Sequence, residues 1–367
     1  NKSEFLEDFQ IFKDYLVVET RKKGLPQIQI INRKNKNKTY IKFKDPCYTA
    51  SLASNSKYDS TSFKYVYSSL KTPLLIYSQS FISGKKTKIW QQKINNFKEN
   101  AYVTDRISIK GRDGTKIPIS IIYKKGLNLS SAPILFYGYG SYGSNVEPSF
   151  KLSFFPLIDD GFIFAIAHIR GGQELGRDWY DQGRMMNKMN TFTDFIDCTR
   201  ALHKKNIGNK EKTYAMGGSA GGLLMGAVIN MEPTLYKGII SAVPFVDVLT
   251  TMSDQSIPLT TFEYKEWGNP ANIKEYFYIK KYSPYDNIES KPYPAILVTS
   301  SLYDSQVQYF EPAKYVPKLR EFSTSENPIL LRMNLIGGHA GKSGRLESLR
   351  ETAEELSFIS HLESKVS

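Results

Sequence analysis

Residues 213–230, TYAMGGSAGGLLMGAVIN, constrain the fold more than any other stretch of this sequence. An apolar segment predicts a strand at 213–216, the turn Gly217-Gly218-Ser219-Ala220-Gly221 follows, and small residues predict a helix at 221–230. Gly-x-Ser-x-Gly between a strand and a helix is the nucleophile elbow, in which the glycines leave space around a serine on a strained turn. The same residues can also form an ordinary turn that packs a helix closely on a strand. The rest of the chain therefore has to decide between the two interpretations.

Beyond residue 101 the sequence alternates between strand-like and helix-like segments. Strands are predicted at 117–123, 134–137, 162–168, 213–216, 238–243, 295–300 and 329–335, and helices at 191–204, 221–230, 312–321 and 347–362. Such alternation predicts a mostly parallel sheet with helices on both faces. With an elbow after a middle strand, it predicts an α/β-hydrolase domain at 99–367, within the α/β fold class.

Residues 1–98 are rich in β-branched and aromatic residues, and polar turns divide them into short segments. Strands are predicted at 15–20, 27–32 and 40–43, and again at 63–68, 74–78 and 88–91. Each set spans the roughly 40–45 residues of a four-stranded propeller blade. A propeller needs about four to eight blades to close. About two blades therefore predict a partial β-propeller domain, and either a longer protein or a second chain that completes the propeller.

Composition narrows the expected partners and cofactors. The net charge is +13, but lysine, asparagine, isoleucine and tyrosine are abundant throughout, which indicates an AT-rich genome rather than nucleic-acid binding. The longest strongly apolar stretch, 161–169, is about half of a membrane span, so no membrane association is expected. Cys47 and Cys198 lie far apart and lack the spacing of a metal site. We therefore expect no metal, no cofactor and a reducing, cytoplasmic location.

A serine nucleophile needs a general base, normally a histidine. Among the four histidines, His339 alone lies in a glycine-rich loop, 337–341, that comes after a predicted strand and after Ser219. It is therefore the predicted base. Packing roles in the core or on the surface are expected for the others, which are His168, His203 and His361.

The base in turn needs a carboxylate, which in this fold lies between the serine and the histidine in the chain. Asp304, in the loop directly after the strand predicted at 295–300, is the favoured acid. Asp247 is a rival, but it follows the strand next after the elbow, one strand too early. Asp286, a second rival, lies in a segment typical of a turn cap.

The negative oxygen that forms during acyl transfer needs two hydrogen-bond donors. The backbone N–H of Ala220, at the start of the helix after the elbow, is the natural first donor. The glycine- and tyrosine-rich loop 138–143 follows another predicted strand and can come close to the site, so one of its tyrosine hydroxyls is a candidate second donor.

Several segments are similar to one family of enzymes. They are YGYGSYG, HIRGGQELGRDWYDQG, GGSAGGLLMGAVIN, VPFVDVLTTM, PLTTFEYKEWGNP, SPYDNI, YDSQVQYFEPAKY and GGHAGKSGR. Over nearly the whole chain they resemble the oligopeptidase B (protease II) branch of the prolyl-oligopeptidase family of serine peptidases. In that family a seven-bladed propeller caps an α/β-hydrolase domain and admits only short peptides. Residues 1–98 resemble only the end of that propeller.

The resemblance implies a role for each residue of the predicted site. It implies Ser219 as nucleophile, Asp304 as acid and His339 as base, in agreement with the reasoning from chain order. It also implies Tyr139 as the oxyanion donor beside the N–H of Ala220, and hydrolysis of short peptides after Arg or Lys.

The resemblance further implies how a basic substrate is held, and here the sequence departs from the family. Glu263 matches the first of two acids that bind the basic side chain, but the second position is Lys265. Glu147 matches the first of a further acidic pair for a second basic residue, and the other position is Ser149. Ala340 replaces a glycine beside the histidine. We therefore predict a weakened preference for basic residues.

Two alternative functions stay open on the sequence alone. The departures and the short propeller are typical of a decayed or split remnant of such a peptidase that no longer catalyses. An open site without a full propeller would also suit an esterase or an acyl-peptide hydrolase with the same fold. Covalent labelling of Ser219 separates the remnant from the two enzymes.

Overall fold

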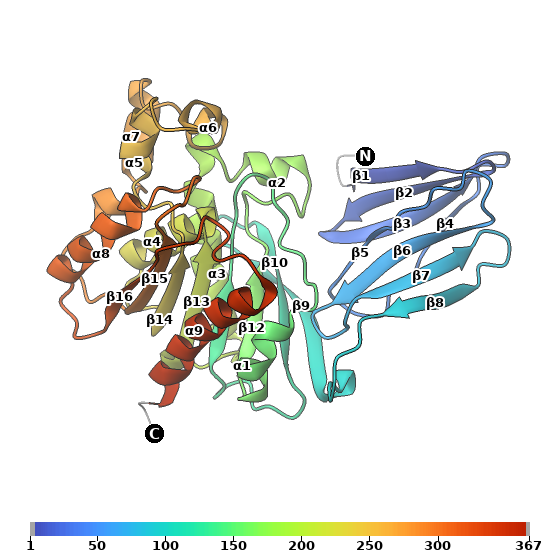
Figure 1. Cartoon of the computed structure of the whole chain (residues 1–367), viewed down its shortest axis with the longest axis horizontal. Coiled ribbons are helices and arrows are strands. Elements are labelled where there is room, and N and C mark those ends of the chain that lie inside the picture. The colour runs from blue at the N-terminus through green and yellow to red at the C-terminus, as the bar shows by residue number, and fades with distance from the viewer. Residues whose placement is uncertain (1–3, 365–367) are drawn as a thin grey trace.

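Two four-stranded antiparallel sheets begin the chain, as seen in a computed structural model that describes residues 4–364 (Figure 1). The first sheet contains β1 (Glu4–Ile11), β2 (Tyr15–Lys22), β3 (Leu25–Asn32) and β4 (Lys38–Tyr40), and the second contains β5 (Tyr48–Leu52), β6 (Ser62–Ser69), β7 (Leu75–Ser80) and β8 (Lys86–Gln91). In each sheet the strands lie side by side in chain order. These are two propeller blades, as predicted.

An aromatic core joins the two blades. Phe12 and Phe63 are buried in it, and the rings of Tyr15 and Phe81 stack with their centroids 4.3 Å apart. Large rings from both sheets therefore remove the facing sides of the blades from water.

The strand predicted at 40–43 is wrong in its position, because β4 ends at Tyr40. The Ile41 N–H still donates to the Ile28 carbonyl of β3, at 3.0 Å, and beyond Ile41 the strand does not continue. Ile41 is buried between the blades, and the ring of Phe43 stacks on that of Tyr67, with centroids 5.3 Å apart. After Tyr40 the apolar side chains therefore pack into the core between the blades, with Ile41 buried and Phe43 half-buried.

A single eight-stranded sheet forms the centre of the second part of the molecule. Its strands are β9 (Tyr102–Lys110), β10 (Lys116–Lys124), β11 (Ile134–Tyr137), β12 (Ile163–Ala167), β13 (Thr213–Gly218), β14 (Gly238–Ala242), β15 (Ala295–Ser301) and β16 (Ile329–Asn334). The order across the sheet is β16-β15-β14-β13-β11-β12-β10-β9. The pairs of β10 with β9 and with β12 are antiparallel and the others are parallel. The mostly parallel sheet of the predicted α/β-hydrolase fold is confirmed.

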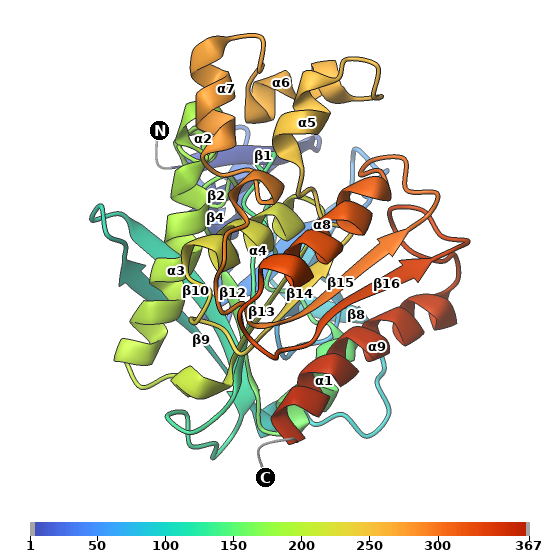
Figure 2. The same ribbon diagram turned by 90° about the vertical axis from the view of Figure 1, so that its left-hand side faces the viewer.

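Helices cover both faces of this sheet (Figure 2). One face packs against α3 (Met189–Lys204), α4 (Ala220–Met231) and α8 (Phe310–Phe322), and the other packs against α1 (Phe155–Asp159) and α9 (Arg345–Ser364). The short α2 is at Arg177–Asp181, and 3-10 turns occur at Glu99–Ala101, Leu152–Phe154, Met185–Asn187, Lys210–Lys212 and Tyr285–Asn287. The four helices that the sequence predicted are all present.

Besides the short α1 and α2, three further helices were not predicted. They are α5 (Val248–Ser253), α6 (Thr260–Trp267) and α7 (Ile273–Lys280), and they lie together above the end of the sheet, between β14 and β15 in the chain (Figure 1). Each has at most eight residues, too few to show a clear helical period. They rise at the carboxyl ends of the parallel strands, where open α/β sheets bind ligands.

The expected domain boundary at residues 98 and 99 falls between the last strand of the second blade and the first strand of the large sheet. Within residues 4–364, no helix has both the length and the apolar character needed to cross a bilayer.

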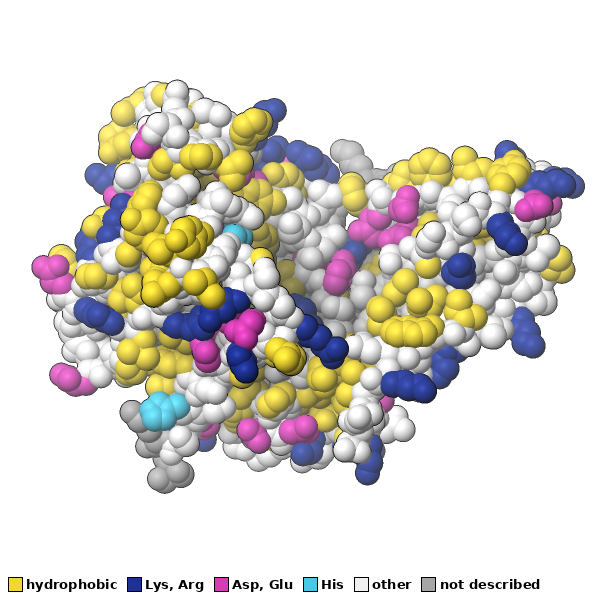
Figure 3. Space-filling view, in the orientation of Figure 1, with side chains coloured by type: hydrophobic (Ala, Val, Ile, Leu, Met, Phe, Trp, Pro, Cys, Tyr) yellow, Lys and Arg dark blue, Asp and Glu magenta, His cyan; other side chains and the backbone are white. Residues whose placement is uncertain are grey.

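Electric charge is divided unevenly between the two parts. Residues 1–98 contain 19 Lys and Arg but 7 Asp and Glu, whereas residues 99–367 contain 30 and 29. In the space-filling view, Lys and Arg side chains are spread over the propeller part at the right, and the surface is hollowed between the two parts (Figure 3).

Candidate active site

The elbow between β13 and α4 holds Ser219 in a left-handed backbone conformation. Its φ is 57° and its ψ is −118°, values that a residue with a side chain rarely adopts. The Ser219 N–H donates to the carbonyl of Ala242, 2.8 Å away, and so ties the turn to β14. A Cβ on Gly217 would lie 2.4 Å from the carbonyl oxygen of Gly221. The glycine spacing of the motif therefore reflects contact between backbone atoms across the turn.

A second loop presents a histidine paired with a buried carboxylate. His339 Nδ1 lies 2.8 Å from Oδ2 of Asp304 and 3.0 Å from Oδ1. The Asp304 carboxylate also accepts the backbone N–H groups of Gln306 and Val307, each at 2.9 Å. Its side chain is fully buried. These bonds hold the Asp304 carboxylate against Nδ1 of His339 and leave the other ring nitrogen, Nε2, available for proton transfer.

Neither rival acid lies against His339. Asp247 is buried and forms an ion pair with Lys314, and Asp286 is exposed in a 3-10 turn. The other histidines have packing roles. His168 and His203 are buried and bond to Ser120 and Thr213, both at 2.8 Å, whereas His361 is exposed on α9.

Tyr139 lies beside the serine. Burial raises the pKa of Tyr139 to about 12, and a hydrogen bond with the Ser219 side chain opposes that rise. The hydroxyl therefore keeps its proton at neutral pH. Within residues 4–364, no hydrogen bond joins Ser219 to His339. Such bonds are often long without substrate and tighten when it binds.

A cavity of about 330 Å³ opens on Ser219, and we call it the Ser219 cavity. Its walls include Tyr139, Tyr142, Phe245 and Trp267. Glu263 supplies the acidic group, and its Oε2 accepts the hydroxyl of Tyr142 and the indole N–H of Trp267, both at 2.8 Å. A cavity with aromatic walls and one fixed carboxylate suits a side chain that has an apolar stem and a cationic end.

Lys265 does not line the Ser219 cavity. Two residues apart on a helix, it and Glu263 point in widely different directions, and the Lys265 side chain is exposed. The next residue, Glu266, is buried, and its carboxylate accepts the Tyr142 N–H at 2.9 Å and the Tyr180 hydroxyl at 2.5 Å.

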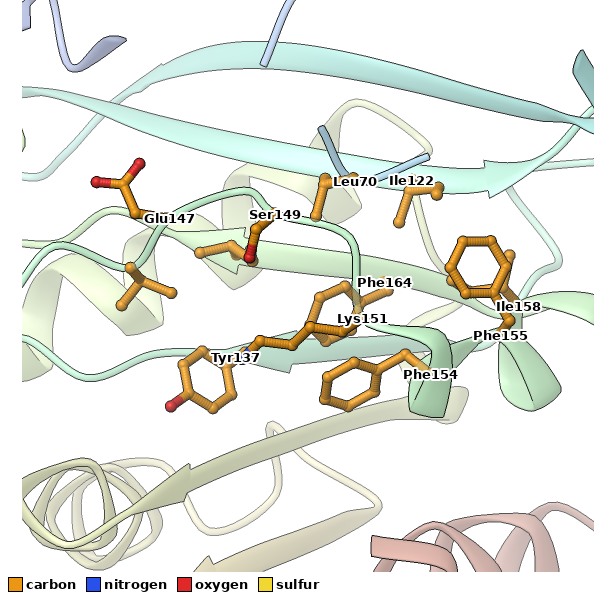
Figure 4. Close-up of a pocket in the computed structure, with 12 residues that line it drawn as sticks. Leu70, Ile122, Tyr137, Glu147, Ser149, Lys151, Phe154, Phe155, Ile158 and Phe164 are labelled. Carbon is orange, nitrogen blue, oxygen red and sulfur yellow. The ribbon is translucent and has the colours of Figure 1, made fainter. Parts of the chain in front are cut away.

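Glu147 lies outside the Ser219 cavity, against the propeller part. Its Oε1 is 2.5 Å from Nη2 of Arg21 on β2, and Nε of the same arginine is 2.7 Å from Oε1 of Glu7. With Ser149, it lines a separate cavity of about 20 Å³ between the two parts (Figure 4). In this structure the Glu147 carboxylate is therefore occupied by a residue of the chain itself.

Ala340 fits the loop at His339. The residue is exposed and is not among the residues with positive φ, so a side chain adds no strain there. Asn334 Oδ1 accepts the N–H groups of Ile336 and Gly337, each at 3.1 Å, and this contact fixes the start of the loop.

Sequence reasoning missed a buried lysine under the loop 138–143. The ammonium group of Lys188 donates to the carbonyl of Gly140 and to Oγ of Ser141, both at 2.7 Å, and lies 4.9 Å from the ring centroid of Trp267. Burial lowers the pKa of Lys188 to about 8. The lysine links the loop that carries Tyr139 to a wall of the Ser219 cavity. One lysine in a lysine-rich chain gave no sequence signal.

Sequence reasoning also missed Glu311 on α8. Its buried carboxylate accepts the N–H groups of Val246 and Asp247, both at 2.9 Å, and the hydroxyl of Thr251 at 2.7 Å. Burial raises its pKa to about 7. It orders the segment that leads from β14 into the wall of the Ser219 cavity. No group of three or more His, Cys, Asp and Glu side chains in the described part of the chain is arranged to hold a metal ion.

Comparison with known sequences and structures gives relatives for both parts. The prolyl oligopeptidase family matches residues 148–365, and the N-terminal β-propeller domain of prolyl oligopeptidase matches residues 1–92. Dipeptidyl aminopeptidase BI of Pseudoxanthomonas mexicana is 46% identical over 357 residues, which are 97% of this chain and 49% of that protein. Protease 2 of Moraxella lacunata is 42% identical over 361 residues, 98% of this chain and 52% of that protein.

A solved structure has the same fold throughout the chain. Oligopeptidase B from Leishmania major superposes with a TM-score of 0.93 and 40% identity, over 99% of this chain and 52% of that one. The chain spans about half the length of the relatives that it matches. The resemblance to oligopeptidase B is confirmed, and because the family match covers more than half of its residues, this chain belongs to the prolyl oligopeptidase family.

Proposed function

We propose that this chain is a serine peptidase that hydrolyses short peptides. The observation that carries the proposal is the strained Ser219 at the end of β13, with the paired Asp304 and His339 on the loops that follow β15 and β16 at the same sheet edge. Ser219 Oγ attacks the peptide carbonyl, and Nε2 of His339 takes its proton and then delivers it to the leaving amine. Asp304 holds the ring through Nδ1. Water then releases the acyl group by the same steps.

The oxyanion donors in this proposal are the Tyr139 hydroxyl and the Ala220 N–H. The first N–H groups of a helix have no partner within the helix, and Ala220 begins α4. The proton that Tyr139 keeps at neutral pH is the one it donates. Each donor of this kind contributes about 2.7–4 kcal/mol to transition-state stabilisation.

A fluorophosphonate probe tests the nucleophile. We expect it to label the wild-type protein and to leave Ser219→Ala unlabelled, because Ser219 is the sole serine of the elbow at 217–221. Folded wild-type protein without labelling would support the inactive remnant instead. Labelling together with hydrolysis of esters but not of peptides would support the esterase or acyl-peptide hydrolase.

We further propose cleavage after Arg or Lys, with Glu263 as the partner of the basic side chain. The support is its place in the Ser219 cavity, where the described residues leave its Oε1 without a hydrogen-bond donor. Charges in water interact by about 1 kcal/mol at 4 Å. We therefore expect the exposed Lys265 to weaken the basic preference by less than about tenfold.

Peptide amides that differ only in Arg, Lys or Phe before the cleaved bond test this specificity. Glu263→Gln should lower kcat/KM for the Arg substrate and spare the Phe substrate, and Lys265→Glu should change the Arg to Phe ratio by less than about tenfold. If the Arg to Phe ratio of kcat/KM is near one in the wild type and rises by more than tenfold in Lys265→Glu, Lys265 strongly weakens the basic preference, as the sequence predicted.

The location and assembly of the protein are part of the same proposal. Two free, buried cysteines, Cys47 and Cys198, support a cytoplasmic location. The two blades support completion of the propeller by a further segment or a second chain, because a pair of blades leaves sheet edges unpaired. Peptides small enough to pass such a propeller are the proposed substrates, with no nucleic-acid or membrane partner.

A further inference from the structure

A second cavity of about 230 Å³ is lined in part by His339, which does not line the Ser219 cavity. It is bounded by the carboxyl ends of β14, β15 and β16 and by the first half of α9. Its polar lining includes His339, Thr299, Ser300, Arg332, Glu351 and Glu355. The proposed peptidase mechanism uses only His339 of this set.

The second cavity has more acidic than basic groups. Glu351 and Glu355 line it with a single cation, Arg332, whose Nη1 lies 3.7 Å from Oε1 of Glu351. Arg332 also forms an ion pair with Glu354, outside the cavity. Burial raises the pKa of Glu355 to about 7, and the neighbouring Glu351 and Glu354 add to the rise. The positive charge of Arg332 opposes this rise, but its ion pairs are with Glu351 and Glu354, and no cation of the described residues forms an ion pair with Glu355.

Hydrogen bonding in the second cavity is also incomplete. The one hydrogen bond that Glu355 receives from the described residues comes from Oγ1 of Thr299, at 3.3 Å. Ser300 is 3% exposed, and its Oγ has no partner within residues 4–364. Buried polar groups are nearly always satisfied. An ammonium or guanidinium group donates several hydrogen bonds and carries the missing charge.

The second cavity lies next to residues of the proposed reaction. His339 lines it, and so does Ala242, whose carbonyl accepts the N–H of Ser219. The acyl half of a peptide occupies the Ser219 cavity, on the side of Glu263. The amine half leaves past His339, which gives the leaving nitrogen its proton.

We propose that the second cavity binds a basic side chain on the amine half of the peptide, with Glu355 as its carboxylate and Ser300 and Thr299 as further acceptors. This inference rests on the proposed peptidase function. It implies that an amine with a basic side chain also reacts well in the reverse direction. The acyl–Oγ bond of Ser219 then breaks, a C–N bond forms, the amine loses a proton to His339, and that proton returns to Ser219 Oγ.

Transfer of the acyl group to an added amine tests this proposal directly. With a saturating peptide ester the acyl group fills the Ser219 cavity, and lysine amide and norleucine amide compete with water as acceptors. The two acceptors differ only in the ammonium group. We expect the wild-type protein to transfer about tenfold more of the acyl group to lysine amide than to norleucine amide. Glu355→Gln should remove most of that difference. Glu347→Gln, on the same helix but outside the cavity lining, should keep it.

Failure of this inference differs from failure of the proposed function. If the wild-type protein hydrolyses the ester but transfers the acyl group equally to both amides, the inference is wrong. The proposed peptidase function is then unaffected. No hydrolysis and no probe labelling overturns both. If Glu355→Gln does not fold, calorimetry on the double variant Ser219→Ala and Glu263→Gln, whose Ser219 cavity has lost its own carboxylate, decides: lysine amide should bind and norleucine amide should bind about tenfold more weakly. Equal binding overturns the inference.

Discussion

Lys188 carries a buried ammonium group, and the free-energy cost of burying this charge depends on pH. The ammonium is buried among Gly140, Ser141 and Trp267, with Glu266 as the neighbouring acid that favours its charged form. Burial lowers its pKa from 10.5 to about 8. Between these values the unfolded chain binds a proton that the folded chain has lost. Stability from this group therefore rises with pH across that interval.

We expect the free energy of unfolding of the wild type to rise between pH 8 and 10 relative to Lys188→Met, by up to roughly 3 kcal/mol. Urea unfolding at several pH values measures the difference. Lys188 directly precedes α3 and Lys205 directly follows it. Lys205→Met, which removes an exposed lysine, should show no such trend. A flat difference for Lys188→Met would mean that Lys188 is solvated.

Tyr139 gives a second prediction at this scale. If its hydroxyl stabilises the oxyanion, Tyr139→Phe should lower kcat by about 10²–10³-fold with little change in KM. The ring remains, so the cavity wall is kept. Steady-state kinetics with one peptide amide measures this, and Tyr303→Phe, an exposed tyrosine, is the control. A loss below about fivefold would remove Tyr139 from the oxyanion site.

Candidates for the nucleophile, base and acid could be chosen by sequence reasoning because chain order and loop chemistry restrict them. Ser219 needs glycines, His339 was alone in a suitable loop, and the structure places Asp304 against it. The surroundings were not accessible. Arg21 meets Glu147 across 126 positions of sequence, and the exposure of Lys265 depends on the helix that carries it.

At the scale of elements, the elbow depends on which glycine is replaced. A Cβ on Gly217 would lie 2.4 Å from the Gly221 carbonyl oxygen, whereas a Cβ on Gly218 would meet the Ala242 carbonyl oxygen at 3.5 Å, an ordinary contact. We expect Gly217→Ala to destabilise the protein by about 1–3 kcal/mol and Gly218→Ala to be nearly neutral. Thermal unfolding of the two variants checks this, and similar melting temperatures would contradict it.

Strands and helices with strong periodicity were predicted within a few residues, and weak ones were missed. β1 and β9 contain charged residues that interrupt alternation, and β5 is short and rich in Ala and Ser. The helices α5 to α7 owe their place to contacts with each other and with the 3-10 turn at Met185–Asn187. Such contacts between distant segments leave no local pattern in the sequence.

At the scale of the molecule, Arg21 joins the propeller part to the hydrolase part. Its guanidinium is 2.5 Å from Glu147 and 2.7 Å from Glu7, and its side chain is 5% exposed. Arg21→Met leaves two carboxylates near each other without their cation. We expect a loss of about 3 kcal/mol in the free energy of unfolding.

Denaturant unfolding measures this loss, and limited proteolysis between the two parts shows whether they separate. Lys22→Met is the matched control, because Lys22 is the next residue and its ion pair with Glu4 is half exposed. Its effect should be much smaller than that of Arg21→Met, because solvent screens the pair. Equal effects of the two substitutions would mean that the Arg21 contact does not hold the parts together.

The uneven division of charge has a consequence beyond stability. With 19 basic and 7 acidic residues in the first 98 and near balance in the rest, the molecule has a large electric dipole moment along its length. Its field extends about 8–10 Å into a physiological salt solution. Near an anionic surface such a dipole turns the protein before contact, with its blades in front and its α/β-hydrolase part behind.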